Sequence, residues 1–232
     1  MASEREEATV PDTLTVRETR DVAPFRAVEL RYFGQLHLRQ GPETSVEIEG
    51  DPDVLAKVRT RVTGDTLVLE IGETWLDRLT SGVLLVAHRP LHYHVVTPDL
   101  ERIAVSGTGK VDADGVRADR LDVVVSGTGD VALSGVACDE LAATISGRGA
   151  FELAGRADRL QIRVSGSGDV DAGELAAAEA EVRISGQGNA TVRVRERLDV
   201  RLSGVGQVRY HGDPTVTQRI SGAGSVTQAS PG

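Results

Sequence analysis

Residues 121–131 read LDVVVSGTGDV, and this short stretch decides the fold because its pattern recurs along the chain. Its Ser-Gly-x-Gly core occurs seven times, at spacings of 18 to 20 residues. The copies begin at Ser106, Ser126, Ser146, Ser165, Ser185, Ser203 and Ser221. A tandem repeat of this period indicates an architecture in which each unit buries its apolar face only by stacking on the next.

Polar and apolar residues alternate around each copy of the motif. In the quoted stretch, Leu121, Val123 and Val125 precede the motif and Val131 follows it. Such alternation is typical of a strand with one buried face. A second point where the chain can turn falls at Gly115, Gly135, Gly155 and Gly212. The sequence therefore predicts an all-β parallel solenoid, with about two strands and two corners in each coil of 18–20 residues.

The interior of this solenoid should consist of columns of stacked residues, one from each coil. We expect one column to contain Val123, Ile145, Val164, Ile184 and Leu202. The alternation stays in phase through the motif, so both motif glycines should point inward, where a bend leaves no room for a Cβ atom. Cys138 shares its repeat position with alanines, which predicts a buried structural thiol.

The N-terminal half carries strand patterns without the motif. We expect strands at Val28–Leu30, Leu36–Leu38, Val46–Ile48, Leu67–Ile71 and His94–Thr97, and one helical turn at Asp53–Lys57. We interpret residues 13–105 as irregular β coils that cap the regular coils of residues 106–228, all in one continuous solenoid. Residues 1–12 are expected to form a flexible tail.

Charge and composition argue against several classes of protein. The net charge of −9 disfavours nucleic acid or an anionic membrane as the main partner, because both require a basic surface. No segment is long and apolar enough to span a membrane, and residues 1–7 lack the apolar stretch of a signal peptide. We therefore expect either a cytoplasmic protein or an exported one whose signal is not part of this sequence.

The order of the motifs resembles that of the auto-transporter adhesin head domains, also called GIN domains. The matching segments are Phe25–Val28, Leu36–Gly41, Val46–Ile48, Gly64–Leu69 and Val95–Ile103, followed by the Ser-Gly-x-Gly series. The resemblance covers roughly residues 20–228. It implies a right-handed β-helical fold, a bacterial origin and an exported or lipid-anchored location. It implies no enzyme, no cofactor and no catalytic residues.

Two patterns suggest ion or phosphate binding. Gly-x-Gly can cradle a phosphate, but no copy extends to the G-x-G-x-x-G pattern that opens a helix, so we interpret the motif as structural. Asp130 and Asp169 directly follow the second motif glycine, a faint likeness to calcium-binding repeats. The other copies carry Lys110, Ala150, Asn189, Gln207 and Ser225 there. These are too few converging oxygens for calcium.

The histidines suggest a transition-metal site. His92 and His94 share one strand face, and His88 lies close in sequence. Two imidazoles at this spacing can share a metal, but a third ligand is not obvious from the sequence. A solvated strand face explains the same pattern.

The most informative outward feature is a series of arginines two residues before the motif serine. In consecutive copies these are Arg163, Arg183, Arg201 and Arg219. Stacked coils would place them in one column, about 4.8 Å apart. Beside them stand Gln161, Glu181, Asp199 and Thr217. One interpretation is a solvated face with compensated charge; the other is a docking strip for an anionic polymer or an acidic protein surface.

The sequence leaves three functions open. The first is a non-enzymatic binding or structural module, adhesin-like by resemblance, with a protein or a cell-surface polymer as partner. The second is a bactofilin-like scaffold that polymerises end to end through exposed sheet edges. The third is a polysaccharide-processing enzyme, which would need acids with Lys or Arg clustered on successive coils. Polar Gln218 and Gln228 at inward positions favour a monomer or a small homo-oligomer over filaments.

Overall fold

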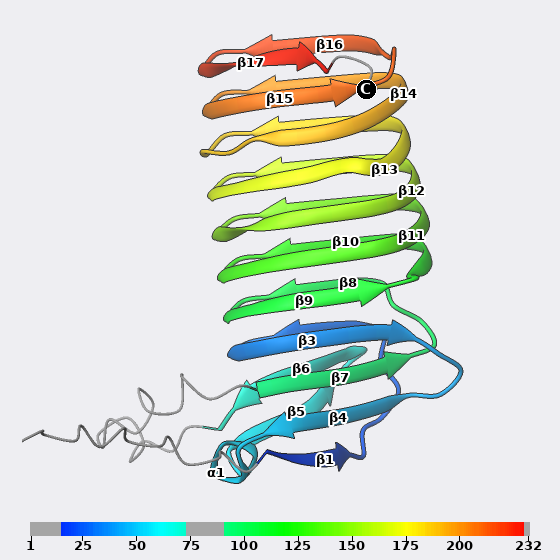
Figure 1. Ribbon diagram of the computed structural model, residues 1–232, viewed down its shortest axis with the longest axis vertical. Helices are drawn as coiled ribbons and strands as arrows, with labels where there is room; N and C mark the ends of the chain where they lie inside the picture. Colours follow the sequence, from blue (N-terminus) through cyan, green and yellow to red (C-terminus); the bar gives the residue numbers. More distant parts are fainter. Residues whose placement is uncertain (1–14, 73–90, 230–232) are drawn as a thin grey trace, which may run out of the picture.

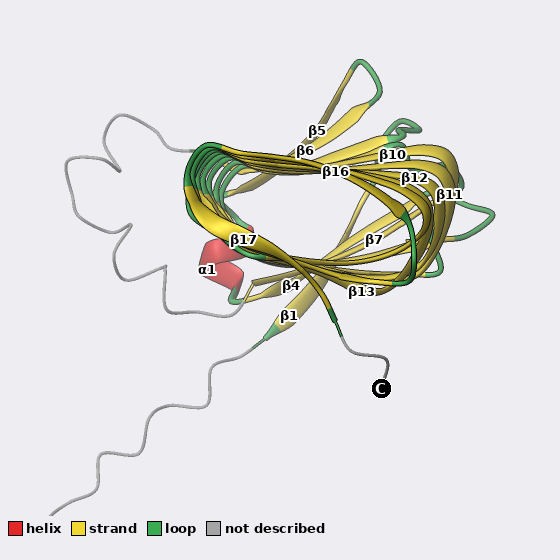
Figure 2. Cartoon of the chain, turned by 90° about the horizontal axis from the view of Figure 1, so that it is seen from above, coloured by secondary structure: helices red, strands yellow, loops and turns green. Residues whose placement is uncertain are grey.

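The strands wind into one elongated solenoid. The computed structural model describes residues 15–72 and 91–229. Neighbouring coils stack along the long axis (Figure 1), and from above they enclose a flattened oval (Figure 2). The later coils consist of β8 (Arg102–Val105), β9 (Thr108–Asp114), β10 (Arg117–Val125), β11 (Thr128–Ile145), β12 (Arg148–Val164), β13 (Ser167–Ile184), β14 (Ala190–Leu202), β15 (Val205–His211), β16 (Thr215–Ile220) and β17 (Ala223–Gln228). The predicted all-β solenoid is confirmed.

Successive coils pair in parallel, with a register set by the distance of each residue from the motif serine. The residues directly before the serines form one inward column, and each of these residues is at most 1% exposed. The column contains Val105, Val125, Ile145, Val164, Ile184 and Leu202. Val123 is buried too, but it stacks on Ile103 and Ala143 in the neighbouring column. The prediction that Val123 shares a column with Ile145 is therefore wrong by two residues.

The motif forms the sharp corner of each coil, where the backbones of successive coils lie closest. The amide of Ser185 donates to the Val164 carbonyl at 2.8 Å, and the next amide donates to the same oxygen at 3.2 Å. A Cβ atom at Gly186 would lie only 1.9 Å from the carbonyl oxygen of Gly166 in the preceding coil. A Cβ at Gly188 would lie 1.9 Å from the Gly168 oxygen. The glycines are sterically required, as expected, but a side chain there would meet the backbone of the preceding coil rather than the tube interior.

The opposite bend is wider, and the central strands run through it. β11, β12 and β13 each span both legs of a coil, so the expected two short strands per coil are fused there (Figure 2). The register shifts at this bend, for example between Leu133 and Val136. Gly115 and Gly135 have φ of 70° and 62°, a left-handed conformation that glycine adopts without steric cost.

Parallel pairing continues into the N-terminal part of the chain. β2 (Ala27–Leu30) pairs with β8, and β3 (Phe33–Gln40) pairs with β9. β6 (Thr66–Ile71) and β7 (Leu91–Thr97) also pair in parallel, with β2 and β3 respectively. Gly34 faces Gly109, so this coil turns at the place of the motif without carrying the motif sequence. Residues 27–40 thus form a coil of the parallel stack inside the segment 13–105 that we expected to be irregular.

The remaining N-terminal elements cover the end of the solenoid. They are β1 (Val16–Arg20), β4 (Ser45–Gly50), α1 (Pro52–Leu55), β5 (Val58–Thr63), β6 (Thr66–Ile71) and β7 (Leu91–Thr97). β4 pairs antiparallel with both β1 and β7, and β5 pairs antiparallel with β6. The helical turn begins earlier than predicted because Asp51 caps it, accepting a 2.9 Å hydrogen bond from the Asp53 amide. Strands β1 and β5 were not expected from the sequence.

Candidate functional site

The structure stacks the four arginines in one column across β12, β13, β14 and β16, hereafter the arginine strip. Arg163 pairs in register with Arg183, Arg183 with Arg201, and Arg201 with Arg219. Arg163, Arg201 and Arg219 are exposed and Arg183 is half-buried. The column lies on one broad face of the oval because each arginine alternates with a residue of an inward column.

Carboxylates neutralise only part of the arginine strip. Arg183 and Arg201 each form an ion pair with the acid two residues earlier on the same strand. Arg163 donates instead to a neutral amide oxygen, that of Gln161, at 3.1 Å. Arg219 forms no ion pair within residues 15–72 and 91–229. Among the described residues, positive charge without a carboxylate partner therefore lies at the two ends of the strip, at Arg163 and Arg219.

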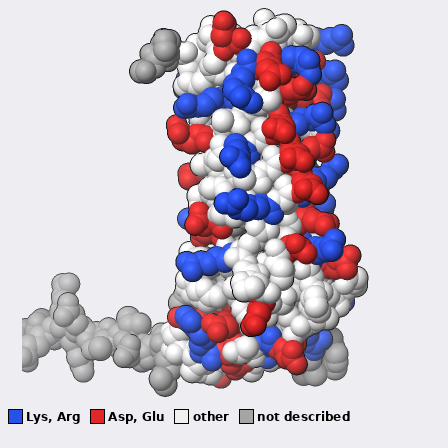
Figure 3. Space-filling model, turned by 90° about the vertical axis from the view of Figure 1, so that its right-hand side faces the viewer, with Lys and Arg blue, Asp and Glu red and all other residues white. Residues whose placement is uncertain are grey.

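A second ladder of charges, which the sequence analysis missed, runs beside the strip near the wide bend. Its members alternate in sign from coil to coil and are Arg120, Glu140, Arg159, Glu179 and Arg197. Ion pairs join Glu140 to both of its neighbours and Glu179 to Arg197. Figure 3 shows acidic and basic side chains lined up along the long axis on this side. The alternation at the repeat spacing could have revealed this ladder in the sequence.

The residues after the second motif glycine bridge coils through hydrogen bonds. Asp130 Oδ1 accepts from the Ala150 amide at 3.1 Å, and Asp169 Oδ1 accepts from the Asn189 amide at 2.8 Å. Asn189 Oδ1 in turn accepts from the Gln207 amide at 3.1 Å. These oxygens satisfy backbone donors of the next coil, which gives the column a structural role.

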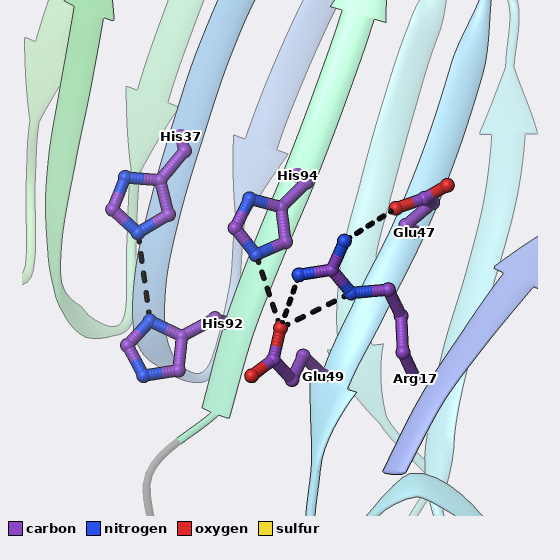
Figure 4. Close-up of polar contacts among 6 residues, drawn as sticks. All are labelled: Arg17, His37, Glu47, Glu49, His92 and His94. Atoms are coloured by element: carbon purple, nitrogen blue, oxygen red, sulfur yellow. Dashed lines mark hydrogen bonds and ion pairs between the residues drawn. The ribbon is translucent and has the colours of Figure 1, made fainter.

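Three histidines gather on the opposite broad face (Figure 4). His92 and His94 project from β7 on one face, as the alternation indicates, and His37 joins them from β3, opposite His94 in register. The three rings are stacked, with centroids 5.1 to 6.4 Å apart. Sequence reasoning missed His37 because it lies 55 residues from His92 and reaches it only through the strand pairing. His88 lies outside the described residues.

Charged side chains from β1 and β4 continue the histidine cluster. Arg17 Nη2 lies 2.6 Å from Glu49 Oε2, and its Nη1 lies 3.2 Å from Glu47 Oε2. The same Glu49 oxygen lies 3.6 Å from His94 Nε2. The hydrogen bond from Arg17 lowers the pKa of Glu49. Burial lowers the pKa of His94, and the nearby His37 and Arg17 lower it further.

A groove with a cavity volume of about 730 Å³ lies beside the histidines. His37 and His94 line one end of it, and it extends towards the wide bend. Its charged lining is mainly acidic, comprising Glu47, Asp112, Asp114, Glu152, Asp171 and Glu174 against Arg17 and Arg39. The two broad faces of the solenoid therefore differ in charge: arginines stack on one, and carboxylates dominate the groove on the other.

Cys138 occupies the alanine column that its sequence position indicates. It pairs in register with Ala118 and Ala157. The thiol is half-buried rather than fully buried. Burial, followed by the charges of Asp139 and Asp158, raises its pKa to about 11. The thiol is therefore protonated at neutral pH and poorly nucleophilic.

Comparison with known proteins places the fold among bacterial structures. The family described as "Putative auto-transporter adhesin, head GIN domain" matches residues 24–214. A "putative adhesin" from Bacteroides fragilis is 24% identical, with 94% of this chain and 99% of that chain covered at a TM-score of 0.84. A "putative lipid binding protein" from Parabacteroides distasonis is 18% identical, with 93% and 96% covered at a TM-score of 0.70. At these identities the likeness shows the fold alone.

Two further observations concern curated proteins and membrane-spanning helices. Among curated proteins, none matches this chain. Within the described residues, no helix has the length and apolar character needed to cross a membrane.

Proposed function

Because the chain belongs to the auto-transporter adhesin head GIN domain family, we propose that it is a non-catalytic binding module that attaches to a carboxylated polysaccharide outside the cell. The family is adhesin-like, and such a role implies a surface or exported protein. The observation that carries the proposal is the arginine strip, which repeats one guanidinium per coil over four coils.

The chemistry of the strip suits a polymer that carries both carboxylates and hydroxyls. Guanidinium groups bind carboxylates through paired hydrogen bonds. A motif serine directly follows each strand of the strip, two residues after the arginine. The exposed residues Ser165, Ser185, Ser203 and Ser221 therefore border the strip. A periodic ligand can bind several coils at once, which multiplies weak contacts without a deep pocket.

The overall charge of −9 opposes a polyanion only at long range. At physiological salt, exposed charges more than about 8 Å apart are largely screened. A ligand in contact with Arg163 or Arg219 therefore responds mainly to the uncompensated guanidinium beside it. This local balance distinguishes the arginine strip from the alternating ladder, where each arginine is held by a carboxylate.

Binding of the intact chain to immobilised polygalacturonate, with neutral dextran as reference, tests the proposal. Replacing Arg163 and Arg219 by Gln should weaken binding about tenfold or more, since each charge-assisted hydrogen bond lost costs on the order of 1–3 kcal/mol. Replacing Arg120 and Arg159 by Gln removes the same charge from the alternating ladder and should change binding little. Equal losses in the two variants, or no binding by the wild type, would refute the arginine strip as the binding surface.

We also propose that the module acts as a monomer or a small closed oligomer rather than a filament. In β16 and β17, Gln218 and Gln228 occupy positions whose partners one coil earlier are Val200 and Tyr210. The Gln228 amide donates to the Gly212 carbonyl at 2.7 Å. Polar groups here weaken the apolar stacking that end-to-end assembly requires. Light scattering after size exclusion checks this, and regular filaments at micromolar concentration would favour the bactofilin-like scaffold instead.

A further inference from the structure

A second cavity, with a volume of about 1010 Å³, crosses β10, β11 and β12. Its lining carries charges of both signs. Within residues 15–72 and 91–229, two arginines and three aspartates of this lining form no ion pair. They are Arg117, Arg156, Asp119, Asp139 and Asp158, and all five are exposed. These side chains are therefore available to a ligand that enters the cavity.

The two arginines stand two coils apart with a small residue between them. Arg117 pairs in register with Ala137, and Ala137 pairs with Arg156. Neighbouring strands are about 4.8 Å apart, so the two arginine backbones lie roughly 9.6 Å apart. The methyl group of Ala137 leaves the space between the two long side chains open. Both guanidinium groups can therefore turn towards one anion above Ala137.

The three aspartates form a column beside the arginines. Asp119 and Asp158 each lie two residues after an arginine on the same strand, and Asp139 lies two residues after Ala137. Residues at this spacing share one face of a strand, with Cα atoms about 6.5 Å apart. The Asp139 carboxylate is therefore within reach of a short chain attached to an anion above Ala137.

This arrangement suits a ligand with both charges better than a simple ion. An anion above Ala137 is attracted by two guanidinium groups but repelled by the nearby aspartate column. A cation beside Asp139 is attracted by carboxylates but repelled by the arginines. A ligand whose anionic and cationic groups are joined by a short chain matches both columns, and each of its charges shields the other from repulsion.

Two guanidinium groups around one position favour a phosphoryl group as the anion. Each guanidinium donates two parallel hydrogen bonds to a pair of oxygens. A phosphate monoester presents three acceptor oxygens, so two guanidinium groups can bind it by sharing one oxygen. A carboxylate has only two oxygens, and it therefore fits one guanidinium group better than two.

We propose that this cavity binds an aminoalkyl phosphate monoester, with the phosphoryl group between Arg117 and Arg156 and the ammonium group at Asp139. The cavity shares no residue with the arginine strip, so the proposal does not depend on the function proposed for that strip.

Isothermal titration of the intact chain with O-phosphoethanolamine at low ionic strength tests the site. We expect saturable 1:1 binding. Inorganic phosphate and ethanolamine should each bind about tenfold more weakly or less, because each lacks one of the two ionic contacts. Glycerophosphoethanolamine, a diester like the headgroup of a phospholipid, should also bind more weakly because it has lost one acceptor oxygen.

Substitutions locate the binding site. Arg156→Gln and Asp139→Asn should each weaken O-phosphoethanolamine binding about tenfold or more. Arg195→Gln and Asp213→Asn remove the same charges at exposed positions outside the cavity lining and should leave binding unchanged. Circular dichroism of each variant separates a lost contact from a lost fold.

Three outcomes would overturn the proposal. The first is the absence of saturable O-phosphoethanolamine binding by the folded wild-type chain. The second is equally tight binding of inorganic phosphate or of the diester, which would contradict the ammonium contact or the monoester. The third is an equal loss of binding in the cavity variants and in their matched controls. Because polygalacturonate is absent from the titration, these outcomes are independent of the arginine strip.

Discussion

Gly186→Ala should destabilise the solenoid by about 3 kcal/mol, because the new methyl group cannot fit between two coils. The added Cβ would lie 1.9 Å from the Gly166 oxygen, whereas ordinary contacts begin near 3.4 Å. Relief requires the coils to separate locally by roughly 1.5 Å. That movement stretches the hydrogen bonds donated by the amides of Ser185, Gly186 and Gln187, now 2.8 to 3.2 Å long. Three such bonds at about 1 kcal/mol each give the estimate.

Urea and thermal unfolding of Gly186→Ala beside Gly173→Ala measure this effect. The estimate corresponds to a fall in Tm of about 6–12 °C for a chain of this size. At Gly173, an added Cβ meets only Asp171 Oδ1 at 3.2 Å and Thr191 Cγ2 at 3.4 Å. Those side-chain ends can move, so the control should change stability by no more than about 1 kcal/mol. Similar Tm values for the two variants would refute the role of coil-to-coil backbone contact at the motif corner.

Three further predictions concern one buried hydroxyl group and two side chains whose pKa differs from its ordinary value. The buried Tyr93 hydroxyl has no hydrogen-bond partner among the described residues. Tyr93→Phe should therefore leave the stability measured by urea unfolding unchanged or raise it by about 1 kcal/mol. A clear loss of stability would show that the hydroxyl has a partner. The lowered pKa of His94 means that the unfolded chain binds protons more readily, so stability should decline as the pH falls from 6.5 through the folded-state pKa. His94→Asn should flatten that decline in unfolding measured across this pH range, and an unchanged slope would contradict the assignment. The raised pKa of Cys138 predicts slow alkylation by iodoacetamide at neutral pH, with a marked acceleration only after unfolding.

The stacked coils could be predicted from the sequence because one motif repeats at nearly constant spacing. The register follows from that spacing, and so does the arginine strip. The direction in which the motif glycines face could not be inferred from the sequence. The alternation of polar and apolar residues shows which face of a strand is buried, but it does not show how close the backbone lies to the next coil. Only the stacked backbones show that a Cβ at Gly186 would meet the preceding carbonyl oxygen.

The N-terminal cap was harder to predict because its contacts are not periodic. β4 pairs antiparallel with β7 and β1, and no repeated motif in the sequence indicates these partners. The histidine cluster depends on the same topology. His37 reaches His92 and His94 only because β3 and β7 are neighbours, so the sequence indicated two of the three imidazoles.

Arginine-specific labelling with phenylglyoxal, read by peptide mass spectrometry, tests the central functional claim most directly. The intact chain is labelled with and without polygalacturonate at physiological salt. We predict that the polymer protects Arg163 and Arg219 strongly, while Arg120 and Arg159, held in the alternating ladder, react at unchanged rates. Protection of the ladder arginines instead, or no protection at Arg163 and Arg219 under conditions where the polymer is bound, would contradict the arginine strip as the binding surface.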